Sequence, residues 1–254
     1  QTTKEIFHKL INSKNTPSAE MYSVFLNNML TVRSLSDSDF GVLLDKFMFL
    51  FKFLEAKDLF LNFFCRRLHT RILYKMTLSL EYEKQVVQRL KSECGVSYVQ
   101  KPEEMLSDVL SRPQLLEEFT QHCRVHKRSL PKFDIEFSVL NDAYWQLLHS
   151  SVKHDLVKGD FIENSMVSFE ESYREKYKGR KLHWKLLNSF GLVRFNIDIA
   201  KGQFLWLSVD LAQLKILNMF NNNYYGSKGS SSNSTKREYI TVNDLKSIEG
   251  LECI

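Results

Sequence analysis

The sequence predicts an α+β fold in which an N-terminal all-α helical bundle precedes an α/β domain with a small antiparallel sheet. Three observations support this prediction. Apolar residues recur every three or four positions through most of residues 1–130, as on one side of a helix. After Pro131 short runs alternate apolar and polar residues, which is the period of a strand. The 254 residues are 43% hydrophobic and 13% aromatic, enough to bury a sizeable core.

Composition narrows the class of protein. With 35 Lys and Arg against 30 Asp and Glu, the net charge of +5 is milder than that of most nucleic-acid-binding domains. The four cysteines are widely spaced and form no C-x-x-C pair, so we expect reduced thiols in a nuclear or cytoplasmic protein. No uncharged run approaches the roughly 18 residues that would span a membrane, so no membrane association is expected.

The helical half, residues 1–130, reads as a bundle with room at its start for the end of a preceding helical repeat. Its predicted helices cover residues 17–30, 40–73 with a break near 55–58, 79–94, 102–110 and 113–125. Pro102 and Pro113 are each expected in a first helical turn, and Gly95 just after a last one. Single helices cannot bury faces so rich in phenylalanine, and a bundle is the simplest solution.

The second half, residues 131–254, reads as the α/β domain. Predicted strands cover residues 133–139, 193–199 and 204–209, with predicted helices over 167–177 and from Asp210 to about 220. Lys201-Gly202 favours a hairpin between the last two strands. The Asn- and Ser-rich residues 221–236 predict a mobile loop, and residues 241–248 begin a further helix. So small a sheet has unpaired edges, which can accept a strand from a partner.

Motifs that carry chemistry are not found. The sequence contains no phosphate-binding glycine loop, nucleophile elbow or H-E-x-x-H pair. The one close His/Cys set, His122-Cys123 with His126, shows no evident fourth ligand, and we interpret it as a helix end without a metal. We therefore expect no cofactor and no catalytic residue. An enzyme with an unrecognised site remains an alternative.

Basic residues gather in three places. Two clusters are interpreted as the solvated face of one helix and the cation-rich end of another. They comprise Arg66, Arg67, His69 and Arg71, and Arg124, His126, Lys127 and Arg128. The third surrounds Gly179, where upstream glutamates dilute the charge. Direct nucleic-acid binding by a winged-helix-type module is therefore the weaker alternative.

Six segments occur in an order and at distances found together in one family. They are FKFLEAKDLF (51–60), CRRLHTRIL (65–73), RLKSECG (89–95), the segment 133–145 ending in a Trp, YREKYKGRKLHW (173–184) and MFN (219–221). The fifth is similar to the family pattern Tyr-x-x-x-His-x-Gly-Arg-Lys-Leu-x-Trp. Together they resemble the C-terminal region of the cullins. Tyr177-Lys178 replaces the usual His-Ser and Gln146 a usual proline, as in a diverged member.

The resemblance implies a scaffold subunit of a cullin-RING ubiquitin ligase. Residues 131–254 would be the α/β cullin-homology domain with the start of a winged-helix segment, in a chain truncated before the last winged helix. Cullins are not catalytic. Their C-terminal region recruits a RING-box protein, a zinc RING protein that adds a strand to the cullin sheet, and thereby the ubiquitin-conjugating enzyme. Substrate-receptor modules bind N-terminal repeats absent here, and the lysine that takes a ubiquitin-like modifier lies beyond residue 254.

The resemblance also assigns residues. The platform for the RING-box strand would comprise Phe133, Ile135, Phe137, Val193, Arg194, Phe195, Asn196, Ile197, Phe204 and Trp206. The family signature is Gly179, Arg180, Lys181, Leu182 and Trp184. Contacts to an acidic tail of a ubiquitin-conjugating enzyme would come from Arg66, Arg67, Lys127 and Arg128. Trp145 and Trp184 are expected to anchor the core, and Gly179 to allow a turn with positive φ or close approach.

Overall fold

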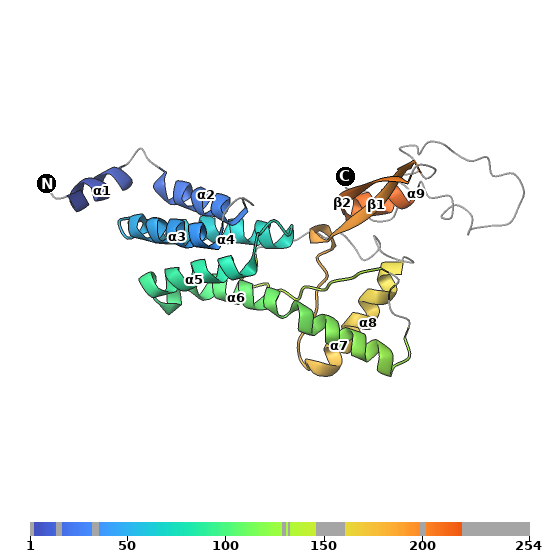
Figure 1. Ribbon diagram of the computed structural model, residues 1–254. Helices are drawn as coiled ribbons and strands as arrows, with labels where there is room; N and C mark the ends of the chain where they lie inside the picture. Colours follow the sequence, from blue (N-terminus) through green and yellow to red (C-terminus); the bar gives the residue numbers. More distant parts are fainter. Residues whose placement is uncertain are drawn as a thin grey trace, which may run out of the picture. The chain divides into compact units, whose positions relative to one another are not determined.

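The computed structural model describes residues 3–13, 17–31, 36–128, 131, 133–145, 161–198 and 202–219 (Figure 1). Its helices are α1 Thr3–Ile11, α2 Ser18–Thr31, α3 Asp37–Phe51, α4 Lys57–Leu73, α5 Leu80–Cys94, α6 Val96–Leu110, α7 Arg112–Val125, α8 Phe161–Lys176 and α9 Leu211–Met219. A 3-10 turn, η2, covers Leu186–Asn188, and the strands are β1 Phe190–Asp198 and β2 Gln203–Asp210. None of the helices described is long and apolar enough to cross a bilayer.

Two compact units share the chain. The helical unit comprises Gln1–Leu116 and Glu136–Gln146, and the sheet unit comprises Glu117–Ile135 and Leu147–Ile254. The two units interleave along the sequence, so they do not meet at one point in the chain. The predicted domain boundary between residues 130 and 131 stays a prediction. The predicted loop over 221–236 and the helix over 241–248 lie outside the described residues.

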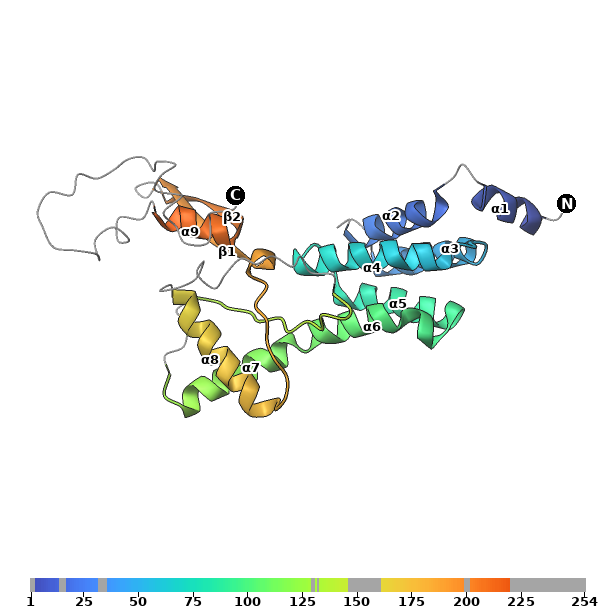
Figure 2. The same cartoon turned by 180° about the vertical axis from the view of Figure 1, so that it is seen from behind.

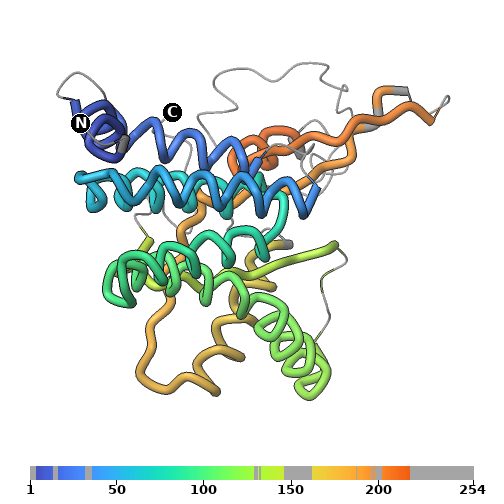
Figure 3. The backbone as a smooth tube through the Cα atoms, turned by 60° about the vertical axis from the view of Figure 1, so that its left-hand side comes forward, coloured from blue at the N-terminus to red at the C-terminus, as the bar shows by residue number. Residues whose placement is uncertain are grey.

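In the helical unit, α2 packs along α4, and α5 packs along α6 (Figures 2 and 3). The α5–α6 pair also contacts α3 and α4, which gives a layered bundle. The predicted break in the long apolar run is confirmed, because α3 ends at Phe51 and α4 begins at Lys57. Ser36 caps α3 by accepting a hydrogen bond from the Asp39 amide at 3.2 Å, and Ser79 caps α5.

The core of this unit is aromatic. Phe40, Phe51, Phe60 and Phe64 are at most 1% exposed. The rings of Phe51 and Phe60 meet edge to face with centroids 4.9 Å apart. Burying each such ring contributes about 1.5–3 kcal/mol, so the phenylalanine faces noted in the sequence are what holds α3 against α4.

The start of α6 differs from its prediction. The sequence predicts that Pro102 opens a helix, but α6 begins at Val96 and holds Pro102 in its interior. Gly95, at φ +92°, ends α5 and directly precedes α6. Glycine adopts this angle without strain, so a new helix can start there. Pro102 then has no N–H to donate to the carbonyl of Tyr98, and its ring crowds that carbonyl.

The predicted strand over residues 133–139 is wrong. Residues 133–145 include an extended stretch, but the described part of the chain pairs it with no strand. Instead Phe137 is buried, and Glu136 binds Lys75 at 2.6 Å and Arg112 at 3.3 Å. The alternating pattern indicates extended backbone with one covered side. It does not specify whether a sheet or a set of helices covers that side.

The sheet unit is built around α7, α8 and the β1–β2 hairpin. Phe119 on α7 lies 6.0 Å from Phe169 on α8, which in turn contacts the half-buried Trp184. Gly179 has φ +90° in the turn after α8, and nothing lies within 4 Å of where its Cβ would be. Its requirement is therefore conformational and not steric. Asp210, the predicted start of the next helix, caps α9 by accepting a hydrogen bond from the Gln213 amide at 2.7 Å.

Candidate functional site

The candidate site is the β1–β2 hairpin. The strands pair antiparallel, with Arg194 opposite Trp206 and Phe195 opposite Leu205. Gly202, at φ +65°, lies in the connection. The sheet has two strands, so within the described residues each strand is paired along one edge only. An unpaired edge presents a row of backbone donors and acceptors to a further strand.

Directly opposed residues share a face of an antiparallel pair, and one face is exposed and rich in large side chains. We call it the outer face, and it carries Leu192, Arg194, Phe204 and Trp206. Leu192 is 70% exposed and Trp206 62%. The Arg194 guanidinium lies 4.3 Å from the centroid of the Phe204 ring, which meets Trp206 edge to face. Arginine and aromatic side chains of this kind are enriched where proteins bind one another.

The other face of the hairpin is partly covered. Val209 is buried, Val193 and Leu207 are half-buried, and α9 packs against both strands. Phe195 and Leu205, nearer the hairpin turn, remain 45% and 52% exposed. A two-stranded hairpin is at best marginally stable by itself. A partner that covers its apolar surface would stabilise it, since burying one leucine contributes about 1.5–3 kcal/mol.

The predicted platform residues divide between two places. The hairpin brings together Val193, Arg194, Phe195, Asn196, Ile197, Phe204 and Trp206. Phe133, Ile135 and Phe137 belong to the extended segment and not to the sheet. Of the predicted platform residues, those that the structure brings together therefore lie on a two-stranded hairpin.

The four cations predicted to contact an acidic tail differ in whether they already bind other groups of the protein. Arg66 and Lys127 are exposed. Arg67, by contrast, donates to the Ser23 hydroxyl at 3.1 Å and pairs with Glu20 at 3.5 Å. Arg128 pairs with Glu171 and donates to Ser168. Two of the four cations are thus already engaged, which weakens both the acidic-tail and the nucleic-acid interpretation.

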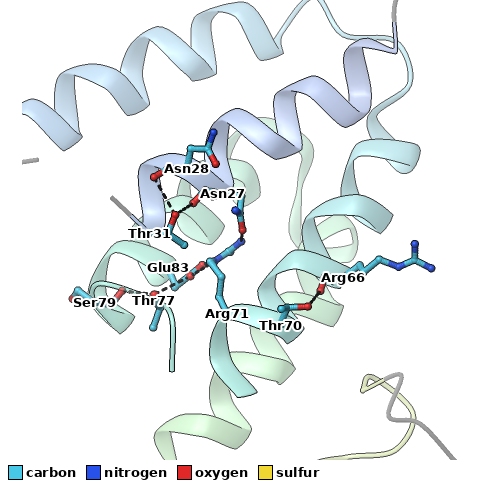
Figure 4. A network of polar contacts seen from close by, with 9 residues as sticks. All are labelled: Asn27, Asn28, Thr31, Arg66, Thr70, Arg71, Thr77, Ser79 and Glu83. Carbon is cyan, nitrogen blue, oxygen red and sulfur yellow. Dashed lines mark hydrogen bonds and ion pairs between the residues drawn. The ribbon is translucent and has the colours of Figure 1, made fainter. Parts of the chain in front are cut away.

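The prediction that Arg71 lies on a solvated helix face is wrong. Its side chain is 2% exposed and binds the carboxylate of Glu83, which is fully buried. Figure 4 shows the surrounding network, in which Asn27 accepts from Arg71 at 2.9 Å and Thr77 donates to Glu83 at 3.0 Å. A cation at helical spacing among apolar residues can also face the interior when a buried carboxylate pairs with it. Glu83 lies on another helix, so the pattern along α4 does not reveal this partner.

The signature segment mostly has a structural role. Arg180 lies over the Tyr177 ring at 4.9 Å and donates to the Tyr173 hydroxyl at 3.4 Å. The indole of Trp184 donates to Glu170. Leu182 is half-buried, whereas Lys181 is exposed. Trp145, in the helical unit, is 1% exposed and donates to Asp108 at 2.8 Å, so it is a core residue.

A surface cavity of about 540 Å³ in the helical unit bears on the enzyme alternative. It is lined in part by Cys65, Arg66, His69 and Lys101. Burial raises the pKa of the Cys65 thiol to about 11, against the opposing charge of Lys101. Burial and the same lysine lower the pKa of His69. At neutral pH this cavity therefore holds a protonated thiol, which is a weak nucleophile.

Comparison with known proteins gives two family matches. A model of the cullin alpha solenoid domain matches residues 1–115, and one of the cullin alpha+beta domain matches residues 139–251. The chain is 27% identical over 245 residues to Cullin-4 of Dictyostelium discoideum, covering 96% of this chain and 30% of that protein. It is 29% identical over 220 residues to human Cullin-4A (86% and 28%) and 28% identical over 172 residues to Dictyostelium Cullin-1 (67% and 22%). The chain thus spans less than a third of the length of these relatives.

Proposed function

This chain belongs to the cullin family, and from that membership we propose that it is part of the scaffold of a cullin-RING ubiquitin ligase. We further propose that the β1–β2 hairpin recruits a RING-box protein. The observation that carries this proposal is a two-stranded sheet with an exposed aromatic outer face and, within the described residues, an unpaired edge on each strand. Strand addition suits such a hairpin, because backbone hydrogen bonds supply affinity while side chains such as Leu192 and Trp206 select the partner.

In this proposal the chain itself performs no bond-making step. The RING-box protein would position the ubiquitin-conjugating enzyme, and the scaffold would hold it near a substrate. Substrate-receptor modules would bind helical repeats that precede this region, and a ubiquitin-like modifier would join a lysine beyond it. We propose a nuclear and cytoplasmic location. The protonated state of the Cys65 thiol supports a non-catalytic role for the cavity around it.

The decisive experiment is co-expression of the 254-residue chain with a RING-box protein, followed by size-exclusion chromatography. We expect a stable 1:1 complex and better solubility than that of the chain alone. The substitutions Leu192→Asn and Trp206→Ser should each reduce capture at least tenfold. Both positions are exposed, so the chain should keep its helical circular dichroism.

Val96→Asn is the matched control, because Val96 is 63% exposed at the start of α6 in the helical unit. It should leave capture unchanged. A soluble monomer that never binds the RING-box protein would overturn the proposal. Equal loss of capture in Val96→Asn and Leu192→Asn would show that the effect is not local to the hairpin.

The exposed cations Arg66 and Lys127 are proposed to attract an acidic tail of the ubiquitin-conjugating enzyme. Attraction of this kind accelerates encounter and is screened by salt. We expect the association rate of an acidic tail peptide to fall as ionic strength rises, and to fall at low salt when Arg66 is replaced by Gln. An association rate indifferent to salt would contradict this part of the proposal.

A further inference from the structure

Two histidines and a glutamate meet between α7 and α8 in the sheet unit. His122 lies in the last turn of α7, His126 follows four residues later just after the helix ends, and Glu175 lies on α8. The His122 Nε2 is 3.4 Å from one Glu175 oxygen, and the His126 Nε2 is 3.9 Å from the other. One ligating atom from each of the three residues lies within 4.8 Å of the others. The three side chains therefore converge on one point.

The backbone orients one of the two imidazoles. The Nδ1 of His126 lies 3.1 Å from the carbonyl oxygen of His122. A carbonyl accepts a hydrogen bond and cannot donate one, so this nitrogen carries the proton of the neutral ring. The lone pair is then on Nε2, the nitrogen near Glu175. Metal-binding histidines are commonly fixed in this way by a second partner.

The other imidazole is buried and incompletely satisfied. The His122 side chain is 8% exposed. Its Nδ1 has no hydrogen-bond partner among the described atoms. Buried polar atoms in proteins nearly always have a partner, so such an atom calls for an explanation. The nitrogen that faces Glu175 is the other one, Nε2, so coordination by His122 beside this glutamate would use Nε2 and would not itself satisfy Nδ1.

The donor set fits a particular class of ion. Two imidazoles and a carboxylate, with a fourth position left for water, form a usual tetrahedral zinc set. Bonds of about 2.1 Å at tetrahedral angles separate ligand atoms by roughly 3.4 Å. The observed separations of 3.4 and 3.9 Å are close to this value. Imidazole nitrogen also favours zinc and its transition-metal neighbours over magnesium or calcium.

Two of the flanking cations already have carboxylate partners. Arg128 is paired with Glu171, and Lys176 with Glu118. The Glu175 side chain is 61% exposed, so it is free to make the small shift that closure of the site requires. Since α7 and α8 are also joined by the Phe119–Phe169 contact, the two halves of the site are already held together.

We propose that His122, His126 and Glu175 form a binding site for a divalent transition-metal ion, with Zn²⁺ the best fit. The bound ion would link α7 to α8. Because the folded chain would bind the ion more tightly than the unfolded chain, Zn²⁺ should raise the midpoint of thermal unfolding. The inference concerns the chain by itself and does not depend on capture of a RING-box protein.

The test is titration of the metal-free 254-residue chain with Zn²⁺ by isothermal calorimetry, without any RING protein that would contribute its own zinc. We expect one site per chain with micromolar or tighter affinity, and a thermal midpoint several degrees higher with the ion bound. Glu175→Gln and His126→Ala should each weaken binding at least tenfold. The first replaces an exposed side chain and should not disturb folding.

His183→Ala is the matched control, because His183 is an exposed histidine of the same unit outside the cluster. It should bind Zn²⁺ like the unaltered chain. Absence of saturable binding at micromolar Zn²⁺ would overturn the proposal. So would binding that survives both Glu175→Gln and His126→Ala, because another set of ligands would then hold the ion.

Discussion

Arg71 and Glu83 form a doubly hydrogen-bonded ion pair that is almost completely buried between α4 and α5. The Arg71 Nε donates to one carboxylate oxygen at 2.7 Å, and its Nη2 donates to the other at 2.8 Å. Asn27 on α2 accepts from the remaining guanidinium nitrogen, as Figure 4 shows. The pair therefore connects three helices of the bundle, and its charges are satisfied without solvent.

Glu83→Gln is expected to destabilise the chain strongly. It leaves the Arg71 charge buried without a counter-charge, a loss that costs about 3–5 kcal/mol. Urea denaturation followed by circular dichroism of the helical signal measures it. Glu103→Gln is the control, since Glu103 pairs with Lys91 at 2.8 Å but both side chains are more than a third exposed. That exposed pair contributes at most about 1 kcal/mol.

The combined replacement Arg71→Met with Glu83→Met separates charge from packing. Removal of both charges leaves no ion unpaired, so it should recover most of the stability lost in Glu83→Gln. If Glu83→Gln and Glu103→Gln lower the free energy of unfolding by the same amount, the buried Arg71–Glu83 pair stabilises the fold no more than an exposed ion pair does.

Two glycines should respond to alanine in opposite directions. Gly179 has φ +90° and Gly41 lies within α3, and at both positions the space that a Cβ would occupy has no other atom within 4 Å. Gly179→Ala forces a left-handed backbone on an L residue and should cost about 1–2 kcal/mol. Gly41→Ala should stabilise α3 by about 0.5–1 kcal/mol. Denaturant unfolding measures both, and a stabilising Gly179→Ala would contradict the conformational role of that glycine.

Much of the helical fold could be predicted from local pattern. The break between α3 and α4, the starts of the helices at Ser79 and Asp210, and the hairpin strands all depend on residues close together in the sequence. The paired partner of an extended segment is not a local property. For this reason the alternation over residues 133–139 predicts a strand of the sheet, although Glu136 is held by Lys75 and Arg112 instead.

The candidate sites also differ in whether they depend on residues that are near or far apart in the sequence. The exposed face of the hairpin follows from alternation along each strand, so its residues can be found from the sequence. The cluster of His122, His126 and Glu175 cannot, because the glutamate lies on another helix and no spacing rule connects it to α7. The sequence pattern wrongly predicts that Arg71 is exposed for a related reason. Only its contact with Glu83, on another helix, shows that this cation is buried.

Acid should weaken the anchor of the extended segment. Burial acts to raise the pKa of Glu136, but the hydrogen bond and charge of Lys75, and then Arg112, hold that pKa below its ordinary value of 4.5. A folded-state pKa that is lowered contributes stability above the unfolded value of about 4.5, and this contribution is lost as pH falls through the lower folded value.

Glu136→Gln should therefore reduce the free energy of unfolding near neutral pH. Below about pH 4.5, the free energy of unfolding of this variant should decrease less steeply with falling pH than that of the unaltered chain. Lys75→Met removes the leading opposing influence, so the pKa of Glu136 measured by nuclear magnetic resonance should rise. A pKa of Glu136 that is unchanged by Lys75→Met would contradict this assignment of the cause.

The thiol of Cys65 is expected to resist alkylation. Its pKa of about 11 leaves roughly one thiolate in ten thousand at pH 7, and the thiolate is the reactive form. Cys65 is also only 4% exposed. In mass spectrometry after iodoacetamide treatment at mildly alkaline pH, its modification should be at least a hundredfold slower than that of a small free thiol. Unfolding in urea should restore the normal rate. Rapid alkylation of the folded chain at Cys65 would instead reveal an activated nucleophile, and the cavity beside His69 and Lys101 would then favour an enzyme over a scaffold.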